Sequence, residues 1–410
     1  MGLCLPSGRF GNLAGKGGES PLSIRYLDEY NLKPGARVFV RVDFNLPVSN
    51  GKIQDFTRLT RVKETLEYLR KHQARILIAS HLNRPGGKWD PQYSMGIVAK
   101  ALCSFLKVPV VLFPFVSHKK LAQLLQSERE IYFLENVRFD AREEKNEETL
   151  AREWAQGLDL YVNDAFSVSH RSHCSVVRMP EVLPAVAGFA FREEYRNLGA
   201  LRRDSPRPFA LIFGGKKAST KIPYLQQLAR EVDYILLAGG MANTFLKAKG
   251  YEIGGSFYEE KVLTEAKFLL QEYPEKFVLP DDVVVESAGK ITAVSVEDVP
   301  HDGNIGDIGQ KSVAKFTEYL RKVRGIFWVG PLGIFEREEF QKGTRNIVEW
   351  LKVEYSGYRA GGGGDTLLFL QKCHALEYFH FVSLGGGSAL AFLSGLSLPG
   401  LDALGKPSAG

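Results

Sequence analysis

The most constraining feature of this 410-residue sequence is a repeated alternation of short apolar runs with longer amphipathic segments. Five apolar runs lie in the first half, at residues 36–44, 74–80, 108–114, 130–137 and 158–166. Each has the length of a buried strand, and the segment 58–72 between the first two carries leucine or valine at helical spacing. Strands that alternate with helices in this way predict a mostly parallel sheet with helices on both faces.

The same pattern restarts after the middle of the chain, with apolar runs at 209–215, 234–240, 276–285, 325–331 and 379–387. Several of these later runs end in glycine, whereas the earlier runs lead into Arg, His, Asp or Asn. Ligands bind at the carboxyl ends of parallel strands, and glycine there lets the backbone approach a phosphate closely. The contrast predicts two α/β domains, one for a small anion and one for a nucleotide.

A helix-like stretch that ends in a proline-containing break separates the two sets of runs. We therefore interpret residues 191–208 as an interdomain helix and hinge. The N-terminal domain is expected over 21–190 and the C-terminal domain over 209–392. Residues 1–20 are rich in glycine and other small residues, and we expect them to form a flexible tail.

The formal net charge of +6 is placed unevenly. Residues 1–190 contain 26 Lys and Arg against 20 Asp and Glu, whereas residues 191–410 contain 27 of each kind. A small anionic substrate bound by a few arginines accounts for this excess. A nucleic-acid binder, whose affinity would fall steeply with salt, is an alternative. With 44% hydrophobic and 24% charged residues, the chain has the composition of a globular protein.

The four cysteines, Cys4, Cys103, Cys174 and Cys373, form no closely spaced pair. Neither a zinc site nor a disulfide framework is therefore predicted. A reducing cytoplasm is the expected location. The sequence contains no run of 18 apolar residues, so we expect no membrane span.

Polar residues suited to binding a small anion follow the predicted strands of the first half. They are Asp43 and Asn45 in RVDFNLP, Arg58 in DFTRL, His81 and Arg84 in SHLNRP, Arg138 in ENVRF, and Asp164, His170 and Arg171 in NDAFSVSHRSH. A guanidinium group pairs with phosphate or carboxylate through two parallel hydrogen bonds, and the helix start near Arg58 adds positive potential. We expect these residues to converge, although a single arginine after a strand is more often part of a surface ion pair. The acidic run 143–148 is interpreted as a solvated helix start rather than a metal site.

Two glycine-rich loops of the second half are suited to phosphate. GGKKASTK at 214–221 places Lys216, Lys217 and Lys221 directly after a predicted strand. GGGGDT at 361–366 ends in Asp365, whose carboxylate can hold magnesium through a nucleotide phosphate, and in Thr366, which can start a helix whose N–H groups face phosphate. A glycine run alone is more often a plain loop. The chain contains no GxxxxGK[ST] motif, so a Walker-type NTPase is disfavoured.

Together these motifs resemble those of the phosphoglycerate kinases, in the same order from about residue 22 to about residue 404. They include RVDFNLP, SHLNRP, ENVRF, YVNDAFSVSHRSH, GGKKASTK, GGMANTFLKAKGYEIG, LPDDVVV, DIGQKS, GPLGIFE, KGTRN and GGGDT. The resemblance implies two Rossmann-like α/β domains around a central cleft with a hinge, the N-terminal domain being completed by about 393–410. It implies a monomeric, cytoplasmic enzyme of glycolysis and gluconeogenesis that interconverts 1,3-bisphosphoglycerate plus ADP and 3-phosphoglycerate plus ATP with Mg²⁺, without nucleic-acid or membrane partners.

The resemblance also implies roles for individual residues. The phosphorylated acid would be bound by Arg41, Asp43, Asn45, Arg58, His81, Arg84, Arg138, His170 and Arg171. The nucleotide would be bound by Gly215, Lys216, Lys217, Lys221, Gly239, Pro331, Gly333, Glu336, Gly363, Gly364, Asp365 and Thr366. Arg58 and Lys217 would be catalytic, stabilising the phosphoryl group in transit from opposite sides. Glu336 would accept the ribose hydroxyls, and Asp365 would bind Mg²⁺.

Several positions depart from the family pattern, namely Asn83 in place of Gly, Lys216 in place of Ala, Thr220 in place of Asp, Val329 in place of Asn and Leu384 in place of Thr. The usual asparagine at the position of Val329 lies near the nucleotide phosphates. Val329 and Leu384 therefore motivate the main alternative, a catalytically impaired homologue that acts as a nucleotide-binding or interaction protein.

Overall fold

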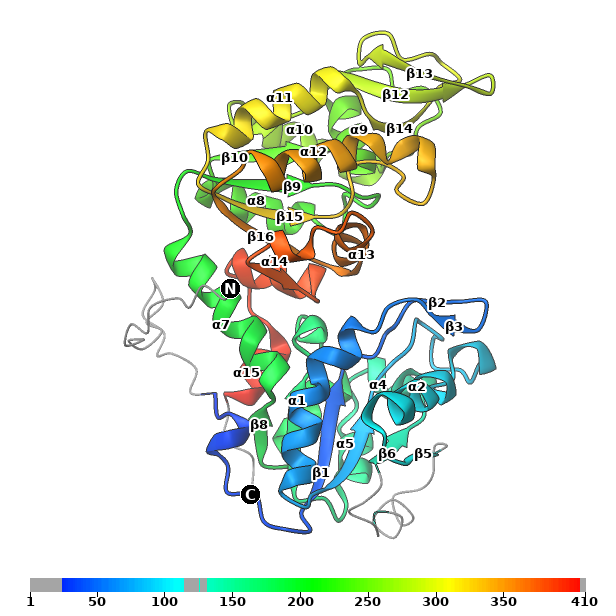
Figure 1. The fold of residues 1–410 in the computed structure, drawn as a ribbon, viewed down its shortest axis with the longest axis vertical. Coiled ribbons are helices and arrows are strands. Elements are labelled where there is room, and N and C mark those ends of the chain that lie inside the picture. The colour runs from blue at the N-terminus through cyan, green and yellow to red at the C-terminus, as the bar shows by residue number, and fades with distance from the viewer. Residues whose placement is uncertain (1–23, 114–124, 126–130, 406–410) are drawn as a thin grey trace.

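The computed structural model describes residues 24–113, 125 and 131–405, and the tail predicted at 1–20 lies outside them. Figure 1 shows two lobes, each built around one large sheet, with the long helix α7 (Phe189–Asp204) between them. Both large sheets are six-stranded and entirely parallel. The predicted fold class of two parallel α/β units is thus confirmed. Every helix among the described residues is too short or too polar to span a bilayer.

The first sheet has the strand order β5-β6-β4-β1-β7-β8. Its strands are β1 (Arg37–Val42), β4 (Arg75–Ala79), β5 (Val110–Phe113), β6 (Ile131–Leu134), β7 (Leu160–Asp164) and β8 (Ala185–Ala187). The helices of this lobe are α1 (Thr57–Lys71), α2 (Gly96–Leu106), α4 (Ala141–Glu144), α5 (Glu148–Ala155) and α6 (Met179–Val182). Shorter turns of helix are η1 (Leu27–Glu29), η2 (Pro91–Tyr93), η3 (Val137–Phe139), η4 (Phe166–Val168) and η5 (Cys174–Arg178), and β2 (Val48–Ser49) pairs with β3 (Lys52–Ile53) as a hairpin.

The second sheet has the strand order β11-β10-β9-β15-β16-β17. Its strands are β9 (Phe209–Phe213), β10 (Tyr234–Leu237), β11 (Phe277–Val278), β15 (Gly325–Val329), β16 (Tyr358–Gly362) and β17 (Phe381–Ser383). The helices of this lobe are α8 (Ile222–Glu231), α9 (Gly239–Lys249), α10 (Leu263–Glu272), α11 (Gln310–Arg321), α12 (Lys342–Val353), α13 (Gly364–Lys372) and α14 (Gly386–Leu393). Short helical turns are η6 (Glu260–Val262), η7 (Glu338–Phe340) and η8 (Leu376–Tyr378).

One predicted strand, 276–285, is wrong as a single element. The chain leaves the parallel sheet after β11 and enters β12 (Asp282–Ser287), which pairs antiparallel with β13 (Lys290–Ser295) and β14 (Asn304–Ile308). Pro280, which lies between the two strands, lacks a backbone N–H and so cannot continue a central strand ladder. The strands β8 and β16 and the strands β13 and β14 of this small sheet had no counterpart among the predicted runs.

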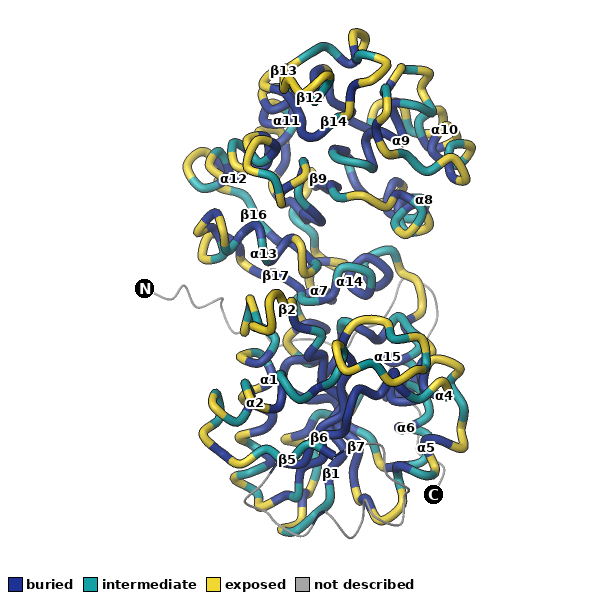
Figure 2. Tube along the Cα trace, turned by 90° about the vertical axis from the view of Figure 1, so that its right-hand side faces the viewer, coloured by how far each residue is buried: buried dark blue, intermediate teal, exposed yellow. Residues whose placement is uncertain are grey.

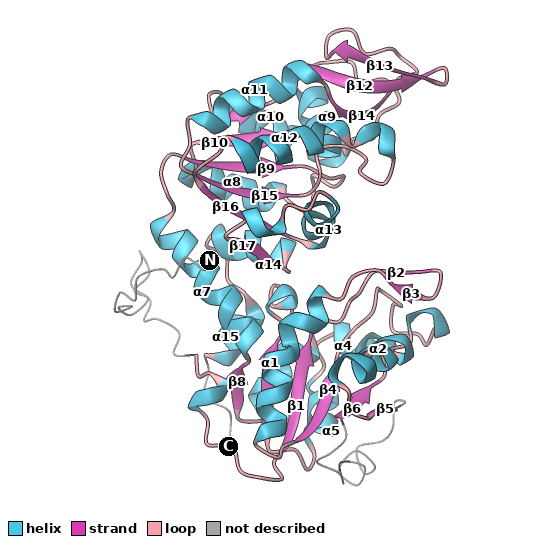
Figure 3. Ribbon diagram, viewed as in Figure 1, coloured by secondary structure: helices cyan, strands magenta, loops and turns pink. Residues whose placement is uncertain are grey.

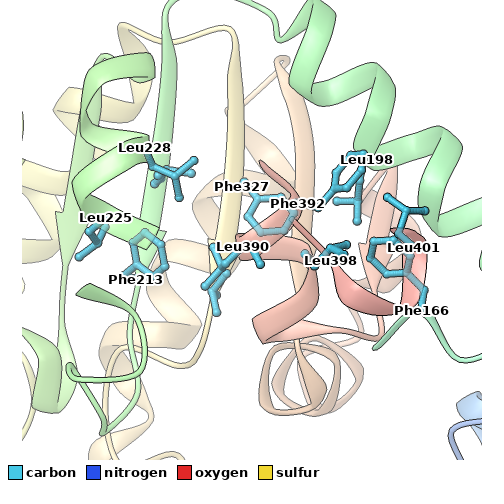
Figure 4. Packing of buried hydrophobic residues seen from close by; sticks show 14 of the residues in the cluster. Phe166, Leu198, Phe213, Leu225, Leu228, Phe327, Leu390, Phe392, Leu398 and Leu401 are labelled. Atoms are coloured by element: carbon cyan, nitrogen blue, oxygen red, sulfur yellow. The ribbon is translucent and has the colours of Figure 1, made fainter. Parts of the chain in front are cut away.

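Helices cover both faces of each large sheet, as Figure 3 shows. In the first lobe, Leu59, Leu66 and Leu69 of α1 and Val98 and Leu102 of α2 are buried against one sheet face. The opposite face belongs to a cluster that continues into the second lobe through Leu198 of α7 and Phe392 of α14 (Figure 4). The dark-blue segments of Figure 2 follow the strands of both sheets, where these apolar clusters lie.

The chain returns to the first lobe at its C-terminal end. After α14, the short helix α15 (Pro399–Leu404) packs beside η5 and η4, and the backbone N–H of Gly400 donates to the carbonyl of Ser169 at 2.9 Å. A Cβ atom on Gly400 would lie 2.5 Å from Val176 and 3.0 Å from Ser169, so only glycine allows this close approach. The last described helix is thereby packed against the segment that carries His170 and Arg171.

Candidate active site

The polar residues predicted from the first half gather at one edge of the first sheet. Asp43 and Asn45 follow β1, His81 and Arg84 follow β4, Arg138 lies in η3 after β6, and His170 and Arg171 follow η4 after β7. The strands β1, β4, β6 and β7 are parallel neighbours, so their carboxyl ends share one edge. The chain therefore brings together residues that are far apart in the sequence, and their binding of a ligand stays a prediction.

Arg41 lies within β1 and is completely buried. Its Nε donates to Ser175 Oγ at 2.7 Å, and its Nη2 lies 3.2 Å from Nδ1 of His81. Ser175 Oγ donates in turn to Oε1 of Glu143 at 2.5 Å, and the Ser175 N–H donates to Oε2 at 2.8 Å. We call these contacts the Arg41–Ser175–Glu143 chain.

The position of Glu143 differs from the one expected from the sequence. The acidic run 143–148 was predicted to be a solvated helix start, but the side chain of Glu143 is fully buried. A buried guanidinium requires hydrogen-bond acceptors inside the protein, and Ser175 Oγ is one for Arg41. Burial raises the pKa of Glu143, and the nearby charge of Arg41 opposes this rise by favouring the carboxylate.

Arg58, in the first turn of α1, is paired with Asp43. Its Nη1 donates to Oδ2 of Asp43, the hydroxyl of Ser167 donates to the same oxygen, and the N–H of Asn45 donates to Oδ1 at 3.0 Å. Burial raises the pKa of Asp43, but Arg58, His81 and Ser167 together hold it well below its ordinary value. Asp43 is therefore an anion that holds the Arg58 guanidinium at the sheet edge.

Asn83 links two of the predicted binding residues. Its N–H donates to Oδ1 of Asn45 at 2.8 Å, and its carbonyl accepts from Nη1 of Arg138 at 2.6 Å. The backbone of Asn83 is left-handed, with φ of 55°, a conformation that glycine adopts freely and asparagine tolerates. This departure from the family pattern thus leaves the loop geometry intact.

The histidines of this edge are neutral at pH 7, and the arginines carry the positive charge. Burial lowers the pKa of His170 to about 4 and that of His173 to about 3, helped by neighbouring arginines, and it also lowers the pKa of His81. Burial, Arg41 and Arg171 lower the pKa of Arg138 to about 10, which still leaves it charged. Arg84 is exposed, and its charge contributes to lowering the pKa of the half-buried Arg171. Positive charges so close together favour a multiply charged anion.

Three loops of the second sheet pack tightly at the carboxyl ends of their strands. The N–H of Gly215, after β9, donates to the carbonyl of Pro331, after β15, at 2.8 Å. The carbonyl of Gly215 accepts from the N–H of Met241 in α9, which begins at Gly239. A Cβ atom on Gly214 would lie 1.9 Å from the Pro331 carbonyl oxygen, so this approach excludes any other residue.

Three lysines surround this junction in different ways. Lys217 is exposed. Lys221 donates from Nζ to the Gly214 carbonyl at 3.2 Å, and burial lowers its pKa. Nζ of Lys216 lies 4.6 Å from the centroid of the Phe257 ring, a cation–π distance.

Helix α13 begins at the glycine run. Gly363 precedes it with φ of 102°, and Gly364 and Asp365 are exposed in its first turn. The hydroxyl of Thr366 is buried, donating to the carbonyl of Gly362 at 2.7 Å and accepting from the N–H of Gly330 at 2.8 Å. Thr366 therefore ties β16 to the loop after β15, while Asp365 is the carboxylate free to face a ligand. No group of three or more potential metal-ligating side chains occurs within the described ranges.

The loop after β15 holds the remaining predicted nucleotide residues. A Cβ atom on Gly333 would lie 2.4 Å from the Phe340 carbonyl oxygen and 2.5 Å from Oδ1 of Asp307, so Gly333 serves close packing. Glu336, further along the loop, is exposed.

The two sheet edges meet around Arg58. Its Nη2 donates to the carbonyl of Leu384, in the loop after β17, at 3.3 Å. The N–H of Leu384 donates to Glu194 of α7 at 2.7 Å, and burial raises the pKa of Glu194 to about 7. A small pocket at this junction is lined by residues of both lobes, including Asp43, Arg58, Ser167, Glu194 and Leu384. Ser167, Ser175 and Glu194 were not among the predicted site residues, because their partners are 124, 134 and 190 residues away in the sequence.

Comparison with known proteins gives the same family over most of the chain. Residues 27–396 match the family model described as phosphoglycerate kinase. A phosphoglycerate kinase of Nautilia profundicola is 40% identical over 398 residues, covering 93% of this chain and 99% of the relative, and one of Rubrobacter xylanophilus is 39% identical over 376 residues, covering 90% and 95%. The crystal structure of phosphoglycerate kinase from Pyrococcus horikoshii superposes with a TM-score of 0.82 at 28% identity, covering 93% of this chain and 98% of that one. The structure of phosphoglycerate kinase from Coxiella burnetii gives a TM-score of 0.75 at 33% identity, with the same coverage.

Proposed function

Because this chain belongs to the phosphoglycerate kinase family, we propose a division of labour among its residues that follows the two sheet edges. The activity of the family is reversible phosphoryl transfer between 1,3-bisphosphoglycerate and ADP, a phosphotransferase reaction of glycolysis with a carboxyl group as acceptor. The observation that carries the assignment is the match over residues 27–396, which includes both sheet edges and the helix between them.

We propose that the edge of the first sheet binds the phosphorylated acid. The binding residues are Arg41, Asp43, Asn45, Arg58, His81, Arg84, Arg138, His170 and Arg171. The charged arginines and neutral histidines at this edge support the proposal, because a phosphate and a carboxylate are both anions. Arg41, being buried, acts through the field of its charge and through His81.

We propose that the loops of the second sheet bind ADP or ATP. The binding residues are Gly215, Lys216, Lys217, Lys221, Gly239, Pro331, Gly333, Glu336, Gly363, Gly364, Asp365 and Thr366. The tight contacts between the loops after β9, β10 and β15 support a preformed phosphate cradle. The N-terminus of α13 adds positive potential from its unpaired N–H groups.

The family generally uses a magnesium nucleotide, and this protein has a carboxylate that suits Mg²⁺ as a ligand. Asp365 is an exposed carboxylate at the first turn of α13, near the Lys221 ammonium. One carboxylate suits Mg²⁺, which in nucleotide sites takes most of its ligands from phosphate oxygens and water. When bound, Mg²⁺ neutralises charge on the phosphate oxygens.

In the proposed reaction, an oxygen of the ADP β-phosphate attacks the phosphorus of the acyl phosphate in line. The bond between this phosphorus and the carboxyl oxygen breaks, and 3-phosphoglycerate leaves as the carboxylate. The donor is already reactive, so the protein needs only to position the reactants, exclude water and neutralise charge. Arg58 leaves Asp43 for the phosphoryl group, and Lys217 approaches the same group from the second lobe. Closure of the lobes about α7 and residues 191–208 brings the two cations together.

The deciding experiment is a coupled assay of ATP formation from ADP and 1,3-bisphosphoglycerate. Arg58→Ala is expected to abolish most turnover while circular dichroism stays unchanged, because Arg58 contacts the phosphoryl group in transit. Arg70→Ala, at the other end of the same helix, is the matched control and should keep normal turnover. Calorimetric binding of nucleotide with no turnover by the unmodified protein would favour the impaired-homologue alternative.

We also propose that the enzyme acts as a cytoplasmic monomer. All of the proposed binding residues belong to one chain, so the site requires no second copy. Activity per molecule should therefore be independent of enzyme concentration, and light scattering should give a mass near 45.7 kDa.

A further inference from the structure

Gln371, in the last turn of α13, forms two hydrogen bonds to the other lobe. Its Nε2 donates to Oδ1 of Asp55 at 3.0 Å and to the hydroxyl of Thr57 at 2.8 Å. Thr57 is the first residue of α1, and the next residue is Arg58. A side chain at the end of one helix is thus bound to the start of another, more than 300 positions earlier in the sequence.

The two helices also meet at the other end of α13. A Cβ atom on Gly364, the first residue of α13, would lie 3.9 Å from Nη2 of Arg58. The first turn of α1 therefore contacts α13 near its beginning and near its end. A helix of nine residues is a stiff rod of about 13 Å, so both contacts move with it as one body.

From these contacts we propose that Gln371 is a positioning residue that couples the nucleotide-binding end of α13 to the placement of Arg58. The inference rests on the proposed function, in which Asp365 and Gly364 face the nucleotide phosphates and Arg58 contacts the phosphoryl group. Gln371 touches neither reactant. It fixes the register between the helix that carries Asp365 and the helix that carries Arg58, and so favours the arrangement in which both reach the same phosphoryl group.

The local structure around Asp55 does not depend on Gln371. Oδ1 of Asp55 also accepts from the N–H of Thr57 at 3.1 Å and from its hydroxyl at 2.7 Å. These bonds form a local turn just before α1 within its own lobe. A change at Gln371 should therefore alter the relation between the lobes while each lobe stays folded, which makes the proposal testable by kinetics.

The sharpest substitution is Gln371→Glu. It preserves the shape of the side chain, removes the donor and places a carboxylate against that of Asp55. A hydrogen bond to a charged acceptor contributes a factor of about ten to an equilibrium. We expect kcat to fall about tenfold, with KM for 3-phosphoglycerate and ATP changed less than twofold, because the separate substrate sites remain intact. A purely structural role would instead lower the melting temperature and leave kcat per folded molecule unchanged.

A donor–acceptor exchange provides the rescue. In the double variant Asp55→Asn with Gln371→Glu, the amide introduced at position 55 can donate to the new carboxylate while its oxygen still accepts from Thr57. Gln371→Lys is a second rescue, since an ammonium group can donate to both Asp55 and Thr57. Both should recover kcat to within about threefold of the parent. The remaining loss of kcat is then smaller than the factor of about ten that one hydrogen bond contributes.

Gln54→Ala is the matched control. Its Nε2 donates to the carbonyls of Ser49 and Lys52, so it also loses two side-chain hydrogen bonds near the start of α1, but none between the lobes. Normal kcat in this control with a low kcat in Gln371→Glu supports the proposal. The proposal is overturned if kcat is unchanged or increased in Gln371→Glu. It is also overturned if the Gln54→Ala control loses as much kcat, or if neither rescue restores kcat. The parent activity is measured first, so absence of turnover in the parent refutes the proposed function and is distinguished from failure of the coupling.

Discussion

Replacement of Ser175 by alanine tests the Arg41–Ser175–Glu143 chain. The three side chains are fully buried, and the Ser175 hydroxyl both accepts from Arg41 and donates to Glu143. Ser175→Ala removes two hydrogen bonds to charged groups and leaves Nε of Arg41 without this acceptor. At about 1.5 kcal/mol or more for each bond to a charged group, the free energy of unfolding should fall by about 3 kcal/mol.

The measurement is urea unfolding followed by circular dichroism at pH 7, with Ser169→Ala as the control. Ser169 is equally buried, but its hydroxyl makes only a 3.4 Å bond to the Ala165 carbonyl, and no charged partner is involved. The control should lose no more than about 1 kcal/mol. Ser175→Ala should also raise KM for 3-phosphoglycerate, because Arg41 is no longer held against His81. Equal stability of the two variants would refute the claim that Ser175 carries the contact between the buried charges.

Further outcomes are expected on the nucleotide side and in the connecting helix. Lys217→Ala should lower kcat by about 100-fold or more, because Lys217 is the cation proposed to approach the phosphoryl group from the second lobe. The melting temperature should stay constant because Lys217 is exposed, and steady-state kinetics and calorimetry measure the two effects. Val329→Asn should lower the free energy of unfolding by about 1–3 kcal/mol, because Val329 lies in the buried apolar cluster; urea denaturation measures this, and an unchanged midpoint contradicts it. Burial raises the pKa of Glu194 to about 7, so the folded state retains a proton that the unfolded state releases near pH 4.5. Binding of this proton stabilises the folded state, and the stabilisation is lost as the pH rises through 7. In Glu194→Gln the melting temperature should therefore fall less steeply between pH 5 and 7.5, and parallel curves for variant and parent would contradict the assignment.

The central strands of both sheets were predictable because their signal is local. Strands β1, β4, β9 and β15 are buried along nearly their whole length, so they appear in the sequence as uninterrupted apolar runs. Strand β13 is largely exposed and carries no such run. Strand β16 ends in Gly361 and Gly362, which are typical of loops, and only pairing with β15 and β17 makes this segment a strand.

The candidate site was predictable where residues follow strands, and not where they reach across the fold. The position of Asp43 after β1 follows from the local pattern. The burial of Glu143 does not, because it depends on Arg41, about one hundred residues earlier, being inside the protein. Gln371 looks like any polar residue near a helix end, and only the folded chain shows that it contacts Asp55. Long-range polar contacts leave no periodicity in a sequence.

The return of α15 to the first lobe also orders events during synthesis. Residues 24–189 emerge from the ribosome before the second lobe, yet the segment that carries Ser169 and Val176 also packs against Gly400, which is made after it. The second lobe lies entirely between these two parts of the chain, so its strands can all pair before the first lobe receives its final helix. Until α15 has been made and has docked, the sheet edge proposed to bind the acid therefore lacks part of its packing.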